Sequence, residues 1–375
     1  MKNKTIPMLA TVLLVSFTAC QTTEILDQSQ DGKINLRTSV NTATKATSLT
    51  QGILASEGFH LAVFEAPIKD ANTTKYFEMD MGSEQLKQDG YYTPYYWNDK
   101  TLHFYAWYPK DVAANPEKSY SISFTPADNA ADQKDLSLAY NTGNKESNNE
   151  SGVLLNFRHA LAQVEMKVCN ASTLPNNIVQ VKAIKVGNAI KSGTLTMPSY
   201  PTSAAVSESN LLTDLWTDNV KTDTGDKNIH TFSVVHDTPL QIANGETVSV
   251  MGDGGNWMMV PQVNPGEWDV NAGGAGDNMY MALLVKLTQG PVTVYPSETT
   301  PEADKKDDYA WTAVPIPAGS PLEAGKKYTY TLTFVINNGN AGNRISDGKE
   351  VLSHPIKLNV TVDDWLEVTG GETLY

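Results

Sequence analysis

One apolar segment near the middle of the chain reads Val153-Leu154-Leu155-Asn156-Phe157-Arg158-His159-Ala160-Leu161-Ala162-Gln163-Val164. Its start follows a long polar stretch that ends at Gly152, and its composition predicts a β-strand over 153–157. A second apolar series, with one irregular step, runs from Leu161 to Val168. We place a domain boundary between the two, near Arg158 to Leu161. This gives an N-terminal domain over 38–160 and a C-terminal domain over 161–375.

Short runs of alternating apolar and polar residues recur on both sides of this segment, and long runs with a helical period are missing. Gly, Pro, Asn and Asp separate the runs, which are rich in Val, Thr and Tyr. This pattern predicts an all-β fold of antiparallel sheets packed as sandwiches. A chain of 375 residues is too long for one small core, so two domains are expected. The runs cover residues 59–63, 102–108, 181–186, 279–287, 328–334 and 356–362.

The N-terminus has the layout of a bacterial lipoprotein signal. Lys2 and Lys4 precede an apolar run from Ile6 to Val15, and small residues lead directly to Cys20. The apolar run is too short to span a bilayer as a folded helix. We expect residues 1–19 to be removed and Cys20 to become an acylated N-terminus, which tethers the protein to a membrane surface. The alternative is a soluble secreted protein with an incidental cysteine.

Charge and cysteine content narrow the possible partners. The formal net charge is −14, and such a surface repels nucleic acid and anionic lipid. The chain has two cysteines, Cys20 and Cys169. If Cys20 carries lipid, Cys169 has no partner for a disulfide, and no cysteine-based zinc site can form. We expect Cys169 to be an inert buried thiol.

No arrangement of residues in the sequence predicts catalysis, a metal or a cofactor. None of the six histidines lies in a zinc-protease, nucleophile-elbow or His-x-His setting. His159 is expected to have a structural role at a turn or domain junction. The acidic segments 253–256 and 304–308 lack EF-hand spacing and are better read as solvated turns. We therefore expect a protein that is not an enzyme.

A dense aromatic cluster occupies residues 91–97 and continues in the run 102–108. Exposed aromatic rings form stacking platforms for sugars, whereas strand alternation favours packing in a core or between domains. Both interpretations stay open, with packing favoured. The candidate ligand contacts are Tyr95, Trp97, Tyr105 and Trp107.

Several segments, taken in order, resemble the fimbrillins of Bacteroidetes, which are the lipoprotein pilins of the fimbrillin A and Mfa-like group. The most specific match is Phe157 to Val164, which is similar to the family signature F-x-H-A-L-A-x-V. The resemblance covers most of the mature chain. The other matching segments are Thr44 to Thr47, Phe59 to Phe64, Trp97 with Leu102 to Pro109, Pro261-Gln262, Leu322 to Tyr328, and Val360 to Trp365.

The resemblance implies two transthyretin-like Greek-key β-sandwich domains in tandem and a structural role in a pilus at the cell outer membrane. In that family a protease, often specific for Arg or Lys, removes the N-terminal strand. A strand from another subunit then fills the groove, so the implied partners are other pilin subunits. The alternative function is a fimbrial tip adhesin or a surface glycan-binding lipoprotein, with a host glycan or protein receptor.

The two ends of the chain fit this mechanism. Ile34 and Leu36 alternate with polar residues and predict a first strand, with 20–37 as the propeptide and Arg37 as the cleavage site. Lys33 and Lys45 are secondary cleavage candidates. The donor strand would come from the tail, through Leu366, Val368, Leu374 and Tyr375. The competing interpretation is that 356–365 is an ordinary last strand and the tail frays.

Overall fold

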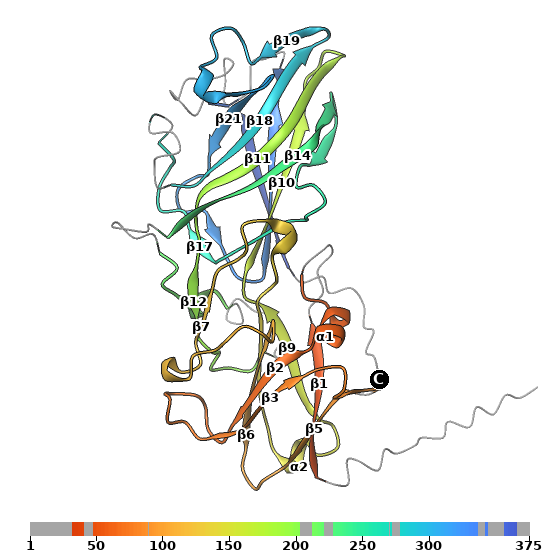
Figure 1. Ribbon diagram of the computed structural model, residues 1–375, viewed down its shortest axis with the longest axis vertical. Helices are drawn as coiled ribbons and strands as arrows, with labels where there is room; N and C mark the ends of the chain where they lie inside the picture. Colours follow the sequence, from red (N-terminus) through yellow and green to blue (C-terminus); the bar gives the residue numbers. More distant parts are fainter. Residues whose placement is uncertain are drawn as a thin grey trace, which may run out of the picture.

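The computed structural model describes residues 32–40, 48–88, 90–202, 212–220, 228–269, 271, 278–336, 342–343 and 356–365. Within these ranges the chain forms mainly β-strands, with two short α-helices and four single turns of 3₁₀-helix. The all-β prediction is confirmed. The molecule is elongated, and two groups of packed sheets follow each other along its long axis (Figure 1).

The first group, here called the N-terminal sandwich, is one ladder of eight strands in the order β3-β2-β6-β8-β9-β1-β5-β4. Two helices, α1 (Gln51–Glu57) and α2 (Lys145–Asn148), accompany it. Every pair is antiparallel except β1 with β9, which run parallel. The strands are β1 (Lys33–Val40), β2 (Phe59–Phe64), β3 (Lys75–Met81), β4 (Leu86–Lys87), β5 (Gly90–Tyr96), β6 (Leu102–Tyr108), β8 (Ser137–Gly143) and β9 (Val153–His159).

The two halves of this ladder pack face to face. The ring of Phe59 on β2 meets Tyr91 on β5 with centroids 5.0 Å apart, and Phe157 on β9 at 5.3 Å. Both contacts are edge-on, which is a favoured geometry for aromatic pairs. Helix α1 begins at Thr50, whose side-chain oxygen accepts a hydrogen bond from the backbone N–H of Ile53, and its Leu54 joins the same core.

The second group, the C-terminal sandwich, contains two sheets. One has the order β15-β10-β23-β24, with β16 also on β10; the other has the order β14-β11-β18-β21-β20, with β19 on β18. The first contains β10 (Ala162–Asn170), β15 (Thr247–Ser249), β16 (Trp257–Met259), β23 (Lys326–Phe334) and β24 (Lys357–Asp364); the second contains β11 (Asn177–Ile190), β14 (Ile229–Ala243), β18 (Tyr280–Gln289), β19 (Val292–Tyr295), β20 (Lys305–Lys306) and β21 (Tyr309–Pro315).

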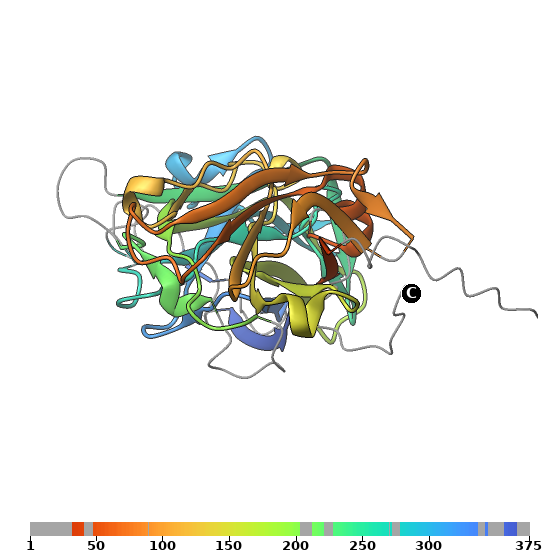
Figure 2. The same cartoon turned by 90° about the horizontal axis from the view of Figure 1, so that it is seen from below.

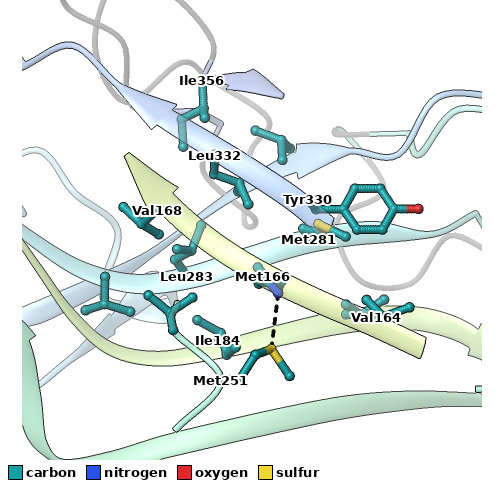
Figure 3. Packing of buried hydrophobic residues seen from close by; sticks show 14 of the residues in the cluster. Val164, Met166, Val168, Ile184, Met251, Met281, Leu283, Tyr330, Leu332 and Ile356 are labelled. Atoms are coloured by element: carbon teal, nitrogen blue, oxygen red, sulfur yellow. Dashed lines mark hydrogen bonds between the residues drawn. The ribbon is translucent and has the colours of Figure 1, made fainter. Parts of the chain in front are cut away.

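Inward-facing residues of the two C-terminal sheets form the largest apolar core. Met166 on β10 lies between its neighbours and residues of the facing sheet such as Leu283 on β18 (Figure 3). The backbone N–H of Met166 points at the sulfur of Met251, 3.2 Å away. The long β11 and β18 supply alternate residues to this core, as the period of two in their sequences predicts.

The two sandwiches share a third apolar core. The strand β7 (Ile122–Phe124) comes before the predicted boundary, yet it pairs with β12 (Gly193–Leu195), which pairs with β13 (Trp216–Thr217). A further pair, β17 (Gln262–Val263) with β22 (Pro321–Leu322), lies close by. Figure 2 looks along the long axis from the end of the N-terminal sandwich. The boundary at 160/161 stays a prediction; it falls between the end of β9 and the start of β10.

Two expectations about single segments were wrong. Alternation over 356–362 predicts one buried face, but in β24 Val360 is 43% and Val362 is 50% exposed. The strand lies at the edge of its sheet, with β23 as its only described neighbour, so the facing sheet does not cover it. Cys169, expected to be buried, is half-buried near the end of β10.

The outer strand β3 is fastened to β2 by a charged network. Both ring nitrogens of His60 contact carboxylates on β3, Glu78 at 2.8 Å and Asp80 at 2.6 Å. Carboxylates only accept, so the ring must carry both protons and a positive charge. Burial lowers the pKa of His60, but the bonds to Glu78 and Asp80 outweigh it and the pKa is raised. The bond from His60 lowers the pKa of Glu78 to about 2.

This network predicts stability that falls at both ends of a pH window. The contribution of His60 is full below pH 6.5 and is lost as the pH rises through its raised pKa. The contribution of Glu78 is full above pH 4.5 and is lost as the pH falls toward 2. His60→Gln should remove about 1 kcal/mol within the window and flatten the decline above it. Denaturant unfolding across pH measures this; equal slopes above pH 6.5 in variant and parent would contradict it.

Candidate functional site

The first strand of the chain lies inside a sheet rather than at its edge. Antiparallel pairing with β5 runs from Lys33 opposite Tyr96 to Leu36 opposite Tyr91. Parallel pairing with β9 runs from Leu36 opposite Val153 to Val40 opposite Phe157. The strand β1 therefore connects the β4–β5 hairpin to the rest of the ladder, because it pairs with β5 on one side and with β9 on the other.

Two side chains of β1 enter the N-terminal core. Ile34 is 0% and Leu36 is 1% exposed, and both belong to the cluster that contains Phe59, Tyr91 and Phe157. Burial of an aliphatic side chain of this size stabilises a fold by about 1.5–3 kcal/mol. The predicted alternation of this strand is thus present in the structure, and β1 fills part of the core as well as part of the sheet.

Polar contacts hold the ends of β1. The hydroxyl of Thr93 on β5 donates to the carbonyl oxygen of Ile34 at 3.0 Å. On the other side, the hydroxyl of Ser39 donates to the side-chain oxygen of Asn156 on β9, also at 3.0 Å. The side-chain amide of Gln51, at the start of α1, donates to the hydroxyl of Thr38 at 2.8 Å. The strand is therefore positioned along its length as well as paired.

Two glycines give the backbone of β1 room. Gly90 has φ +148°, and a Cβ there would lie 2.4 Å from the carbonyl oxygen of Leu36. Gly152, at φ +69°, comes just before β9, and a Cβ there would lie 3.2 Å from the carbonyl oxygen of Asn35. Both positions favour glycine because side chains rarely adopt these angles and would press on β1. Single glycines that flank strand-like runs are the sequence signal for such a close approach. The prediction from sequence placed Gly152 only at the end of a polar loop.

Without β1 this region would be an open groove. The facing edges of β5 and β9 would present unpaired N–H and C=O groups, and the core would lose Ile34 and Leu36. An extended segment with alternate apolar residues would satisfy the backbone groups and refill the core together. Backbone pairing and burial of alternate apolar side chains are thus the two interactions that hold β1 in this site.

Comparison with protein families shows which family this chain belongs to. A family model described as fimbrillin-like matches residues 44–365. The chain belongs to the fimbrillin-like family. The assignment makes it a fimbrial-type protein of the cell surface. The matched range begins after β1 and ends at Trp365.

A solved structure from Bacteroides vulgatus supports the fold of this fimbrillin-like protein. A fimbrial protein from Bacteroides vulgatus is 16% identical, with a TM-score of 0.56; the match covers 89% of this chain and 99% of that one. A candidate cell adhesion protein from Bacteroides ovatus is 13% identical, at a TM-score of 0.45 with 90% and 99% covered. Another from Parabacteroides distasonis is 10% identical, at 0.46 with 91% and 99% covered. A comparison with curated proteins found no match.

The predicted cleavage sites of the fimbrillin-like chain differ in their position on β1. Arg37 is exposed, but it lies in the middle of β1 and is paired with Leu154 of β9. Lys33 begins β1, and its ammonium lies 5.9 Å from the ring centre of Tyr96. Six residues predicted as lipidation, cleavage or donor-strand positions lie outside the described part of the chain: Cys20, Lys45, Leu366, Val368, Leu374 and Tyr375.

Three of the four aromatic side chains named as candidate ligand contacts are buried, as the packing interpretation expects. Trp97 is 8% exposed, and Tyr105 and Trp107 are 2% each. Burial raises the pKa of the Tyr105 hydroxyl, which accepts a hydrogen bond from the backbone N–H of Ile68. The indole N–H of Trp107 donates to the carbonyl of Val112 at 2.8 Å. Both faces of β6 are covered, because the shared core between the sandwiches lies against its outer side.

Tyr95 is the exposed member of the four. It is 37% exposed and stacks on Phe77 at 4.0 Å. In the ranges that the structure describes, no group of three or more His, Cys, Asp or Glu could hold a metal ion. No helix in those ranges has the length and apolar character needed to cross a membrane.

Substitutions at neighbouring residues of β1 should differ in their effect on stability, because Leu36 faces the core and Arg37 is exposed. Leu36→Ala should lower the free energy of unfolding of the N-terminal sandwich by about 2–5 kcal/mol, because it leaves a cavity in the core. Arg37→Ala, one position along on the exposed side, is the matched control and should change it by less than about 0.5 kcal/mol. Denaturant unfolding measures both. Equal effects would show that β1 does not contribute to the core in this way.

Proposed function

We propose that this protein is a structural subunit of a cell-surface fimbria that is exported as a lipoprotein. In this proposal, proteolysis frees β1, and a strand from another subunit takes its place. The observation that carries the proposal is the position of β1. This first described strand lies between β5 and β9 and fills part of the core, yet only residues 41–47 join it to the described chain that follows.

The position of the cut decides what is freed. Residues 41–47 connect β1 to Ser48 and contain Lys45. A cut there would leave the whole of β1 held by non-covalent contacts. A cut after Arg37 would leave Thr38–Val40 on β9, and it would require a protease to reach a peptide that is paired with β9. A cut at Lys33 would leave β1 in place. We therefore propose Lys45 as the site in the folded subunit, and Arg37 as the site before β1 docks.

A donor strand must match the slot. It has to supply apolar side chains at alternate positions, where Ile34 and Leu36 lie, and its backbone must pass close to Gly90 and Gly152. The tail after Trp365 offers Leu366 and Val368 with this spacing, followed by Leu374 and Tyr375 after two glycines. The tail follows β24 at the edge of the C-terminal sandwich, from which it can extend toward another molecule.

The remaining parts of the proposal concern attachment and partners. Cys20 would hold the precursor in the outer membrane by its acyl chains, and cleavage at Lys45 would release the body of the subunit from that anchor. The partners are other pilin subunits. The alternative of a tip adhesin or glycan-binding lipoprotein would rest on Tyr95, because the other three candidate rings are buried. We favour the subunit role.

A controlled cut tests the exchange. With a site-specific protease sequence in place of residues 41–47, cleavage should convert monomers into ladders that resist mild denaturant. Excess peptide corresponding to Lys33–Val40 should suppress the ladders, because it refills the groove. The control carries the same sequence at Gly290, in the turn between β18 and β19, and should stay monomeric when cut. Gel electrophoresis without heating measures the products; a cut protein that stays monomeric at high concentration would rule out this assembly.

The anchor has a separate test. Metabolic labelling with a palmitate analogue should mark the precursor in a Bacteroidetes host, and Cys20→Ser should abolish the label. Cys169→Ser, the matched control, should leave it unchanged because Cys169 is half-buried in the C-terminal sandwich. Mass spectrometry of the N-terminus identifies the modified residue. Label that persists in the Cys20→Ser protein would refute lipidation at Cys20.

A further inference from the structure

The strand β24 forms an open edge of the C-terminal sandwich. It pairs with β23 along its whole length, from Lys326 opposite Asp364 to Thr333 opposite Lys357, without a bulge. Among the described strands β23 is its only neighbour. Natural sheets protect such edges with proline, a bulge or a charge that points inward, and residues 358–362 carry none of these. This stretch of backbone is therefore suited to pair with a further strand.

The even-numbered residues of β24 direct their backbone groups to the open edge. On β23, the carbonyl oxygen of Phe334 accepts a hydrogen bond from the N–H of Ala171, just after β10, at 2.9 Å. Even-numbered residues of β23 therefore face β10, and odd-numbered ones face β24, because backbone groups alternate along a strand. The register with β23 then turns the N–H and C=O groups of Leu358, Val360 and Val362 outward.

The same three residues place their side chains on the face of the sheet that carries the core. Their partners on β23 are buried residues of that core: Leu332, Tyr330 and Tyr328 (Figure 3). Leu358 packs partly on the core, whereas Val360 is 43% and Val362 is 50% exposed. A hollow of about 180 Å³ lies beside the two valines and is lined on another side by Pro321. An apolar surface therefore continues from the core to the open edge.

A second copy of β24 is complementary to this edge. Two copies related by a two-fold axis run antiparallel, and their even-numbered residues must lie opposite each other, because these carry the outward backbone groups. When Val360 lies opposite its own copy, Leu358 lies opposite Val362 of that copy. Backbone groups then pair, and the apolar side chains lie side by side. On the other face, this register sets Lys357 opposite Asp363, both of them exposed.

The charges select this register over its neighbours. If Val360 lay opposite Val362, Leu358 would lie opposite Asp364 and the contact between Lys357 and Asp363 would be lost. A slide in the other direction shortens the paired segment. Because the chain has a net charge of −14, two opposite-charge contacts also offset part of the repulsion between copies.

We propose that two copies of this protein associate edge to edge through β24 and form one continuous sheet across both C-terminal sandwiches. The contact joins subunits side by side and uses no part of the β1 site, so it is independent of the proposed strand exchange. Pairing along so short a strand buries less surface than a standard interface. The dimer is therefore reversible, forms in concentrated protein and separates in mild denaturant.

Disulfide trapping in the uncut chain tests the register. In a protein with Cys20→Ser and Cys169→Ser, Val360→Cys places two thiols opposite each other at the two-fold axis, at a separation that a disulfide spans. Thr361→Cys is the matched control, because Thr361 is also exposed but lies diagonal to its own copy, with Cα atoms about 7–8 Å apart. Under mild oxidation Val360→Cys should form covalent dimers at least about tenfold faster, as measured on non-reducing gels.

Analytical ultracentrifugation of the uncut chain tests the charge pair. Lys357→Asp should raise the dimer Kd at least about fivefold, because it sets like charges opposite each other twice in each dimer. The double variant Lys357→Asp with Asp363→Lys restores the pair in reverse and should return the Kd close to the parent value. Thermal unfolding of each variant shows that it is folded.

Faster trapping at position 360 together with rescue by the double variant supports the proposal. It is overturned if the parent stays monomeric at high concentration, if both cysteines trap equally fast, or if the double variant dimerises no better than Lys357→Asp. Because the chain is uncut and β1 stays in place, strand exchange does not contribute to any of these results. A failure here refutes the β24 dimer, whereas a failure of the cut chain to form ladders refutes strand exchange.

Discussion

The double pairing of β1 is the constraint on which the rest of the N-terminal sandwich depends. A strand at the edge of a sheet can leave and cost one row of hydrogen bonds, whereas β1 serves β5 on one side and β9 on the other. Its side chains also close the core between the two halves of the ladder. Covalent continuity through residues 41–47 is what makes this strand part of the same molecule. In the proposed assembly, a cut in that connection would turn β1 into a ligand that another strand can replace.

The strand β9 also connects the site of β1 with the junction of the two sandwiches. The strand β9 borders the groove along most of its length and ends at His159, against which Trp365 packs. A polar pair buried from all sides, Asp135 with His159, also takes the backbone of Leu49. The backbone of Leu49 and the indole of Trp365 therefore contact the same buried pair.

The sequence was informative where a local pattern corresponds to a local environment. The run at 153–157 became β9, the alternation of Ile34 and Leu36 became the buried side of β1, and the run 102–108 became β6. Tyr105 and Trp107 are buried as in the favoured packing interpretation, but no local signal identifies the shared core that covers them. The sequence failed where the environment is set by distant partners, because Val360 and Val362 alternate as in a buried strand although β24 lies at an edge.

Non-local pairing also hid the groove itself. The partners of β1 lie more than 50 residues downstream in β5 and more than 110 in β9, and the parallel pairing with β9 leaves no turn signal in the sequence. Asp135 could not be assigned to His159 for the same reason, since His159 lies 24 positions further along the chain, beyond β8 and at the end of β9. Family resemblance supplied the idea of a removable strand. The geometry shows that β1 pairs with both β5 and β9 and that its apolar side chains fill part of the core.

Amide hydrogen exchange of β5 and β9 in three states tests the central claim most directly: the intact chain, the cut chain after removal of the β1 peptide, and the assembled polymer. The account predicts that the amides that face β1 are protected in the intact chain, exchange rapidly in the cut monomer, and are protected again in the polymer. Amides that stay protected in the cut monomer, or that stay unprotected in the polymer, would contradict it.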